Sequence, residues 1–459
     1  MPPAPNTKRL TAANLAKPFV TFVERYYPDP FVFLILLTML AFALAVAFTP
    51  TTPTGALVAW GEGLAGLLSF MAQIAITLIT AHALAHTDAV HRLLSALARV
   101  PKSVSACYTL VVLCACAASL LAWSFGLVAG ALMARATATQ AAERGLRVHY
   151  PLLVTAAYCG LAVWHMGYSG SAPLFVATPG HAMTEQMGLL PVTETLFTYW
   201  NLLTILITVA ALAIVCPRLH PQESEVRPAT RVELSSVTVP PPASPTSPNS
   251  FGARLDRSRA LTAMFGGLLL VYLGHYFYSN GFALNLNIVN WSFLMLGLLL
   301  ARSPAHYVEL VLNAGQTVGA VLIQYPFYAG VMGLMAGSGL VDLLGNWFAS
   351  VASAETLGFW AFLAGGLVNL FVPSGGGQWA VQGPVFLQAA AELGTDPAII
   401  VMGVAYGDQW TNLIQPFWTI PLLAVAGLTM RDIMGYCFVL FLVTGVTLGG
   451  AILLVGHFA

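Results

Sequence analysis

The sequence predicts an all-α polytopic membrane protein that is built as an inverted repeat, with two re-entrant helical hairpins and discontinuous helices. Of its 459 residues, 58% are hydrophobic and 8% are charged, whereas a soluble domain carries about 25% charged residues. Two polar runs, at 373–379 and 406–416, interrupt long apolar stretches, and weakly matching residues recur in the two halves. The net charge of zero excludes nucleic acid as a partner held by charge.

Apolar segments that could lie in a bilayer recur along the whole chain. They lie near 31–48, 64–86, 104–122, 125–139, 150–166, 195–215, 260–278, 287–301, 310–336, 357–372, 379–391, 398–425 and 433–456. Several are shorter than the roughly 20 residues of a full span. We expect the pairs 104–122 with 125–139 and 357–372 with 379–391 to form the hairpins, because each pair then starts and ends on one side of the membrane.

Lysine and arginine fall in alternate connections between these segments. They occur in the N-terminus, in 87–103, 135–149 and 217–259, and at Arg302 and Arg431, but not in 49–62, 178–194, 279–286, 337–356 or 392–397. Basic residues accumulate in cytoplasmic loops. We therefore expect a cytoplasmic N-terminus and a C-terminus outside.

The same pattern divides the chain into parts. We expect an N-terminal segment 1–30 with an interfacial helix at 10–27, a first membrane repeat 31–216, a proline-rich cytoplasmic linker 217–259, a connecting span 260–278 and a second, inverted repeat 279–459. The composition of the linker is typical of disordered connectors. The six cysteines lie in apolar segments and are expected to pack as small core residues.

Three weak matches between the halves are separated by nearly the same number of residues. Ala157-Tyr158 matches Ala405-Tyr406, the break at 123–126 matches the break at 374–377, and Gln73 matches Gln324. The predicted orientation makes the two repeats antiparallel across the membrane, which is an architecture used for alternating access. The alternative is two unrelated glycine-rich helix contacts.

The polar run at 373–379 could hold an anion without a basic residue. Its glycines can present backbone N–H groups where a half-helix begins, and its serine, glutamine and tryptophan add side-chain donors. The candidate substrate ligands are Ser374, Gly375, Gly376, Gly377, Gln378 and Trp379, with Trp123 and Ser124 from the other hairpin. A tight turn that only packs two helices is the alternative.

The run at 406–416 contains the only carboxylate deep in an apolar segment, Asp408. A lone carboxylate at a helix centre costs roughly 2.5–3.5 kcal/mol on insertion scales, so a function is expected. On a helix, Asp408, Asn412 and Gln415 would share one face. With Gln409 they are the candidates for coupling to a proton or to Na⁺. The alternative is a carboxylate satisfied by neighbouring donors.

A third polar break, 164–171, lies in the first half. Its Ser169 and Ser171 are further candidate substrate ligands, and His165 could relay protons or simply be hydrogen-bonded in place. The G-x-S-G pattern at 167–170 also occurs in intramembrane serine proteases. A protease would need a histidine on another helix within reach of the serine, and His275 is the only later deep candidate.

At these residues the chain resembles the bacterial short-chain fatty acid transporter family. The resemblance covers essentially the whole chain and is carried by 373–379 with Gly383-Pro384, 405–410, 435–437, 27–30, 325–330 and 177–180. It implies a multi-pass inner-membrane carrier of short monocarboxylates such as butyrate or acetoacetate, within a broader superfamily of inverted-repeat ion transporters. The carboxylate at 408 fits the family, and an elevator-like motion follows by analogy of fold.

The expected function is therefore secondary uptake of a short-chain fatty acid anion, coupled to H⁺ or Na⁺, and not an enzyme activity. A carrier of dicarboxylates or another organic anion is the sibling alternative, and a channel is a further one. No cofactor is expected beyond Na⁺ as an alternative coupling ion, and ATP-driven transport is disfavoured because no G-x-x-x-x-G-K-[ST] run occurs. The expected partners are the substrate, membrane lipid and a second copy in a homodimer.

Overall fold

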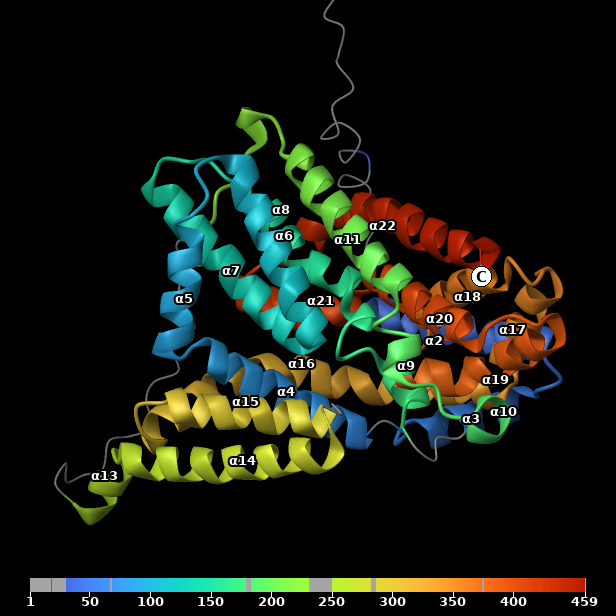
Figure 1. Ribbon diagram of the computed structural model, residues 1–459, viewed down its shortest axis with the longest axis horizontal. Coiled ribbons are helices and arrows are strands. Elements are labelled where there is room, and N and C mark those ends of the chain that lie inside the picture. The colour runs from blue at the N-terminus through green and yellow to red at the C-terminus, as the bar shows by residue number, and fades with distance from the viewer. Residues whose placement is uncertain are drawn as a thin grey trace, which may run out of the picture.

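The computed structural model describes Pro18 and residues 30–66, 68–178, 183–230, 250–281, 286–373 and 375–458, and within these residues every regular element is a helix. The all-α prediction is confirmed. Helices α4, α14, α15 and α16 lie side by side along the long axis of Figure 1, and α6, α7 and α11 run obliquely above them.

The first half of the chain forms α2 to α11. Their bounds are α2 Pro30–Phe48, α3 Pro53–Gly63, α4 Leu68–Ala85, α5 Asp88–Ala98, α6 Val104–Leu121, α7 Trp123–Glu143, α8 Tyr150–Tyr158, α9 Ser171–Val176, α10 Thr184–Met187 and α11 Tyr199–Val215. Short 3-10 turns lie at Cys159–Ala162 (η1), Trp164–Met166 (η2), Val192–Glu194 (η3), Cys216–Leu219 (η4) and Glu223–Glu225 (η5).

The second half forms α13 to α22. Their bounds are α13 Phe251–Asp256, α14 Arg259–Asn280, α15 Leu286–Leu300, α16 Pro304–Gly337, α17 Leu340–Ser350, α18 Leu357–Asn369, α19 Gly375–Leu393, α20 Pro397–Asn412, α21 Pro416–Ala426 and α22 Met430–Phe458.

Four of the described helices are long and apolar enough to cross a membrane: Val104–Leu121, Tyr199–Leu219, Arg259–Asn280 and Met430–Phe458. A fifth span results if the pair Tyr325–Gly337 and Leu340–Ser350, bent by 61°, is counted as one. Other apolar helices, such as Leu357–Asn369 and Pro416–Ala426, are shorter than a span. Several membrane-length helices together with broken, shorter ones are what the apolar segments predict for a multi-pass protein.

Two helix pairs occupy the positions of the predicted hairpins. Helices α6 and α7 join at Ala122, whose backbone is extended at φ −157° and ψ 125°. The break therefore lies at Ala122 and not at 123–126 as predicted, because Trp123 already begins α7. In the second pair, α18 ends at Asn369 and α19 begins at Gly375, so the break lies between these two residues and not at 374–377 as predicted. The re-entrant path of both pairs and the sides of the termini stay predictions.

Each half also contains a helix that is interrupted by polar residues. Helix α8 gives way at Cys159 to two 3-10 turns, and α9 begins only at Ser171. Helix α20 ends at Asn412, and α21 begins at Pro416. The expectation that Asp408, Asn412 and Gln415 share one helical face is therefore wrong for Gln415, which lies in the break after α20.

Regions that the hydropathy pattern leaves as connections contain helices of their own, namely α3, α5 and α17 and the shorter α10 and α13. The start of the predicted linker is also ordered. Arg227 donates from its backbone N–H to His149 Nδ1 at 3.0 Å and pairs with Asp432 at 2.6 Å. Residues 217–230 therefore do not form the disordered linker that their composition predicts. Residues 231–249 and most of the predicted interfacial helix at 10–27 lie outside the described residues.

Glycines bring α18 and α20 into backbone contact. A Cβ added at Gly403 would lie 2.6 Å from the carbonyl oxygen of Gly358, and one at Gly365 would lie 2.9 Å from that of Val404. Small residues allow this close approach of membrane helices. The seam fixes the helix that carries Asp408 against the first helix of the second pair.

We predict that Gly403→Ala destabilises the protein by about 1–3 kcal/mol, since its methyl group must displace backbone rather than a mobile side chain. The matched control is Gly450→Ala, a helical glycine with no atom within 4 Å of an added Cβ. Thermal unfolding of the detergent-purified variants measures both. Equal melting temperatures for the two variants would contradict the backbone contact.

Candidate functional site

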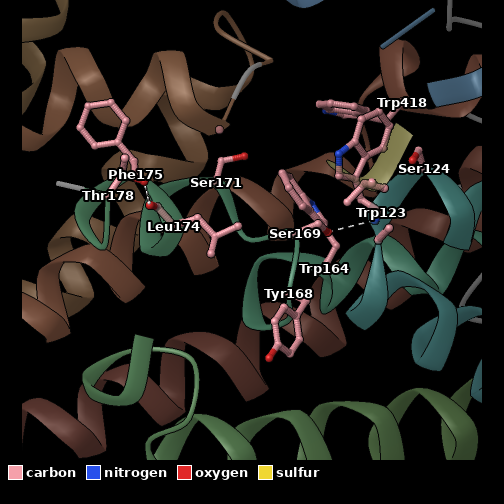
Figure 2. A pocket seen from close by; sticks show the side chains of 13 residues that line it. Trp123, Ser124, Trp164, Tyr168, Ser169, Ser171, Leu174, Phe175, Thr178 and Trp418 are labelled. Carbon is pink, nitrogen blue, oxygen red and sulfur yellow. Dashed lines mark hydrogen bonds between the residues drawn. The ribbon is translucent and has the colours of Figure 1, made fainter. Parts of the chain in front are cut away.

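A cavity of about 250 Å³ lies where the polar breaks of the chain meet. Its lining comes from the start of α7, the segment from η2 to α9, and single residues of α15, α19 and α21. The lining residues are Ala122, Trp123, Ser124, Trp164, Tyr168, Ser169, Ser171, Leu174, Phe175, Thr178, Val289, Gly375 and Trp418. Figure 2 shows Trp418, Ser124 and Trp123 on one side of the cavity and Leu174, Phe175 and Thr178 on the other.

Three tryptophans form one wall of the cavity. The ring centroids of Trp123 and Trp418 are 5.0 Å apart with an edge-to-face angle of 76°, and Trp164 lies 6.2 Å from each of them. The indole N–H of Trp418 has no hydrogen-bond partner among the described residues. The wall is thus apolar and rigid, and it contains one buried donor that is not satisfied within the described chain.

Hydroxyl groups are the most frequent polar groups among the side chains of the lining. Ser169 Oγ accepts a hydrogen bond from the backbone N–H of Trp123 at 3.0 Å, drawn as a dashed line in Figure 2, so its own hydrogen remains able to donate. Ser124 and Ser171 also line the space, whereas lysine and arginine do not occur in the described lining. The cavity can therefore accommodate a small ligand with one polar end, held by neutral donors.

The structure brings only part of the polar run at 373–379 to this cavity. Gly375 lines it, whereas Gly376, Gly377, Gln378 and Trp379 do not. The amide of Gln378 donates to the carbonyl of Gly365 at 2.7 Å, between α19 and α18, and Trp379 is fully buried. Ser374 lies outside the described residues. The ligand role expected of these five residues stays a prediction. The contact of Gln378 and the burial of Trp379 favour a supporting role for these two.

The predicted coupling residue Asp408 is 1% exposed and lies beside His165, which is fully buried. The distance from His165 Nε2 to Asp408 Oδ1 is 3.5 Å. The opposite ring nitrogen, Nδ1, accepts a hydrogen bond from the backbone N–H of Ser171 at 3.2 Å. In a neutral imidazole only one nitrogen carries hydrogen, so this contact places the ring hydrogen on Nε2, toward Asp408. Asp408 Oδ2 has no partner among the described residues.

Asn412 links this acid to the wall of the cavity. Its Oδ1 accepts from the indole N–H of Trp164 at 2.8 Å, and its Nδ2 donates to Asp408 Oδ1 at 3.2 Å and to Gln415 Oε1 at 3.4 Å. Gln409 Oε1 accepts from the backbone N–H of His165 at 3.0 Å. The structure thus gathers the four predicted coupling residues, and it places them directly behind the cavity.

Gly375 is the point where the second helix pair touches this group. A Cβ added there would lie 2.5 Å from two atoms of the His165 ring and 3.2 Å from Ser171 Cβ. A side chain at position 375 would therefore displace either the histidine or the start of α9. The neighbouring Gly376 has more room, with Ser171 Cβ at 4.0 Å as its nearest neighbour.

Sequence reasoning missed several residues of the cavity. Trp164 stands in a polar break that the sequence does reveal, but Trp418, Val289, Leu174 and Phe175 lie in apolar segments that look like any other membrane helix. Only the tertiary arrangement brings them to the cavity. For His165 the sequence predicts either a proton relay or a histidine hydrogen-bonded in place, because a single histidine in a sequence gives no sign of its partner.

Comparison with known proteins gives one consistent result over nearly the full length. A family described as "Short chain fatty acid transporter" matches residues 11–455. A relative from Escherichia coli (strain K12), named for short-chain fatty acid transport, is 40% identical over 93% of this chain and 96% of its own. A Haemophilus influenzae relative with the same name is 36% identical over the same shares, 93% and 96%.

Two solved structures are similar at low identity. The YdaH transporter of Alcanivorax borkumensis covers 92% of this chain and 98% of its own at 16% identity, with a TM-score of 0.45. MtrF of Neisseria gonorrhoeae, described as one of a class of antimetabolite efflux pumps, covers 96% of this chain and 97% of its own at 14% identity, with a TM-score of 0.39.

We predict that a cysteine at position 171 reacts with a small charged methanethiosulfonate reagent in the folded protein, because Ser171 is half-buried and lines the cavity. The background is Cys114→Ala, which removes the one native cysteine that is not buried. The control is Ser119→Cys, a fully buried position outside the lining. Mass spectrometry of the intact protein measures the label. Labelling of Ser119→Cys but not of Ser171→Cys would contradict the cavity.

Proposed function

The chain belongs to the short chain fatty acid transporter family, and on that premise we propose that it is a secondary active transporter that takes up short-chain monocarboxylates across the bacterial inner membrane. It is a multi-pass membrane transporter and not an enzyme. The observation that carries the choice of substrate is the cavity, which is small, walled by tryptophans and furnished with serine hydroxyls.

The size and polarity of the cavity favour a short monocarboxylate. Pockets for drug-sized ligands have volumes of roughly 300–1,000 Å³, and this cavity, at about 250 Å³, is below that range. The tryptophans offer an apolar surface for a short acyl chain. Ser124, Ser169 and Ser171 can donate to one carboxylate.

A dicarboxylate carrier is the sibling candidate, and the described lining does not favour it. A second carboxylate would require a further cluster of donors or a basic residue. The hydroxyl groups lie within one lining that contains no lysine or arginine. Competition by a dicarboxylate in an uptake assay distinguishes the two candidates.

We assign the coupling step to Asp408 and propose a proton as the coupling ion. An anion that enters against a negative-inside potential costs about 2.3 kcal/mol per charge per 100 mV, and a co-transported cation removes this cost. The Asp408 carboxylate faces an imidazole N–H and an amide. Helices α18 and α9, which pack on α20, carry no titratable side chain, whereas the other elements packed on it carry His165 (η2), Cys159 (η1), Glu392 (α19) and Arg431, Asp432, Tyr436, Cys437 and His457 (α22). A buried charge is costly unless it is paired or neutralised.

Two contacts connect proton uptake to the substrate. Ser171 lines the cavity with its side chain while its backbone N–H binds the histidine that faces Asp408. Trp164 lines the cavity while its indole N–H binds Asn412, which in turn binds Asp408. A shift of either residue on substrate binding changes the surroundings of the carboxylate. Na⁺ is the alternative ion, and it would use the same carboxylate with amide oxygens as ligands.

We further propose that transport proceeds by alternating access between two inverted repeats, with an elevator-like movement of the helix pairs and broken helices. The order of a helix pair followed by a broken helix occurs twice, as α6, α7, α8 and α9 and as α18, α19, α20 and α21. The contact between Trp164 and Asn412 joins the two breaks. A shared site between such repeats is the usual place for a transported solute.

The function is tested by uptake of labelled butyrate into proteoliposomes, with protein-free vesicles to subtract leakage of butyric acid. We predict saturable uptake that acetate, acetoacetate and other short monocarboxylates inhibit and succinate does not. In the same assay Gly375→Ala should raise the KM for butyrate at least tenfold, because its methyl group displaces the histidine or Ser171. Gly376→Ala, where an added Cβ has room, is the matched control and should behave as wild type.

Uptake no faster than that of protein-free vesicles would refute the proposal that butyrate is a substrate. Equal effects of Gly375→Ala and Gly376→Ala, with normal saturable uptake in both, would keep butyrate as a substrate but refute the proposed position of its binding site. Inhibition by succinate as strong as that by acetate would favour the dicarboxylate alternative.

For the coupling residue, we predict that Asp408→Asn loses gradient-driven butyrate uptake but still exchanges labelled for unlabelled butyrate at equal pH. The amide keeps the shape of the side chain but cannot take up a proton. Asp342→Asn, at an exposed position on α17, is the control and should keep both activities. Wild-type gradient-driven uptake by Asp408→Asn would contradict the coupling role. A requirement for a sodium gradient instead of a proton gradient in the wild type would identify Na⁺ as the ion.

A further inference from the structure

A second cavity, of about 460 Å³, lies among the end of α4, helix α5 and the C-terminal half of α7. It is lined by Ala85, His86, His91, Leu94, Ser95, Arg99, Leu132, Arg135, Ala136, Thr139 and Gln140. It shares no lining residue with the cavity behind which Asp408 lies. The function proposed above makes no use of it.

This cavity is basic and has no acid among its lining residues. Arg99 and His91 are exposed at its rim, while Arg135 and His86 are half-buried in its wall. The acid on the same helix, Asp88, is already paired with Arg302 through two contacts of 2.5 and 2.6 Å. The side chains of Arg99 and His91 have no hydrogen bond or ion pair within the described part of the chain. The positive charge of the cavity is therefore left for an external anion.

The walls of the cavity are fixed by hydrogen bonds. Arg144, near the end of α7, donates to the carbonyls of Ala98, Arg99 and Pro101 at distances of 2.7 to 3.0 Å. This ties the end of α5 to the end of α7. Arg135 donates to the carbonyl of Val425 at 3.2 Å, which positions its guanidinium from the α21 side. The basic groups are therefore carried by helices that hydrogen bonds hold in place, and not by a loose loop.

Helix α5 starts beside the end of α4 and runs across the direction of α4, α14 and α15 (Figure 1). Helix α14 is one of the helices long enough to span a membrane. The ion pair between Asp88 and Arg302 places the start of α5 beside the short connection between α15 and α16. Helices with one polar and one apolar face that lie across the spanning direction are typical of the membrane surface.

The polar face of α5 is the face that lines the cavity. His91, Ser95 and Arg99 follow one another at intervals of four residues and all belong to the lining. The opposite side carries apolar residues, of which Leu93 is 59% exposed. Leu94, Leu132 and Ala136 add an apolar part to the same cavity. The site therefore combines basic groups at the rim with an apolar wall below them.

We propose that this cavity binds the phosphate group of an anionic phospholipid, with Arg99 and His91 at the headgroup and Leu94 and Leu132 beside the start of the acyl chains. Basic pockets between membrane helices on the cytoplasmic side suit anionic headgroups, and the distribution of lysine and arginine predicts this side for 87–103. A soluble phosphate ester carries the same anionic group but has no acyl chain to contact the apolar wall.

The test is a titration of the detergent-purified full chain with short-chain phosphatidylglycerol, with melting temperature as the readout, since a ligand of the folded state raises it. We expect phosphatidylglycerol to stabilise the protein, phosphatidylcholine of the same chain length to have a much smaller effect, and added salt to weaken the response. His91→Gln with Arg99→Gln should weaken the apparent Kd for phosphatidylglycerol at least tenfold. Both side chains are exposed, so the double variant should fold.

Arg92→Gln is the matched control, because Arg92 is an exposed arginine on the same helix that does not line the cavity. It should bind phosphatidylglycerol as wild type does. Equal stabilisation by the two lipids, or equal affinities of the double variant and Arg92→Gln, would overturn the proposal. Stabilisation by glycerol 3-phosphate at concentrations that match the lipid would overturn the lipid assignment and identify a soluble phosphate ester as the ligand.

Discussion

A broken helix at membrane depth must have its backbone polar groups satisfied by protein, and this requirement organises the centre of the molecule. The last carbonyls of α20 are bound from the other half: Tyr158 donates its hydroxyl to the carbonyl of Asn412 at 2.6 Å and to that of Gln415 at 3.3 Å. The end of α18 is bound from within the second half, since the amide of Gln415 donates to the carbonyl of Asn369. In the first half, the backbone N–H of His165 donates to Oε1 of Gln409 on α20, so each broken helix binds backbone groups of the other.

This mutual satisfaction explains why the candidate site lies where it does. Polar side chains that close the breaks also surround Asp408, and the irregular backbone between η2 and α9 leaves the space that becomes the cavity. The cavity is consequently joined to the histidine through the backbone N–H of Ser171, and to the carboxylate through Trp164 and Asn412. A movement that exposes the site to one side must rearrange the same bonds, which is how a conformational change could be linked to protonation.

The sequence predicts the elements of this fold well because hydropathy and helix breakers act locally. The apolar segments and the polar interruptions near 373 and 412 follow from composition and from proline and glycine positions, but the exact residues at which α19 begins and α20 ends do not. The sequence does not predict helices α3, α5 and α17, because they are short and not apolar throughout. It does not predict the cavity wall for a different reason, since Trp418 and Val289 are brought to the wall only by packing between elements distant in the chain. Gln378 and Trp379 look like ligands in sequence, yet tertiary contacts bury them between helices.

The central claim is that substrate binding and protonation of Asp408 are one linked event. It is tested most directly by calorimetric titration of the purified protein with butyrate, in buffers of different ionisation enthalpy across neutral and alkaline pH. Linkage predicts that binding takes up protons, approaching about one per butyrate where Asp408 is ionised in the free protein. The same titration of Asp408→Asn should show binding without proton uptake. Butyrate binding with no proton uptake by the wild-type protein at any pH in this range would contradict the account.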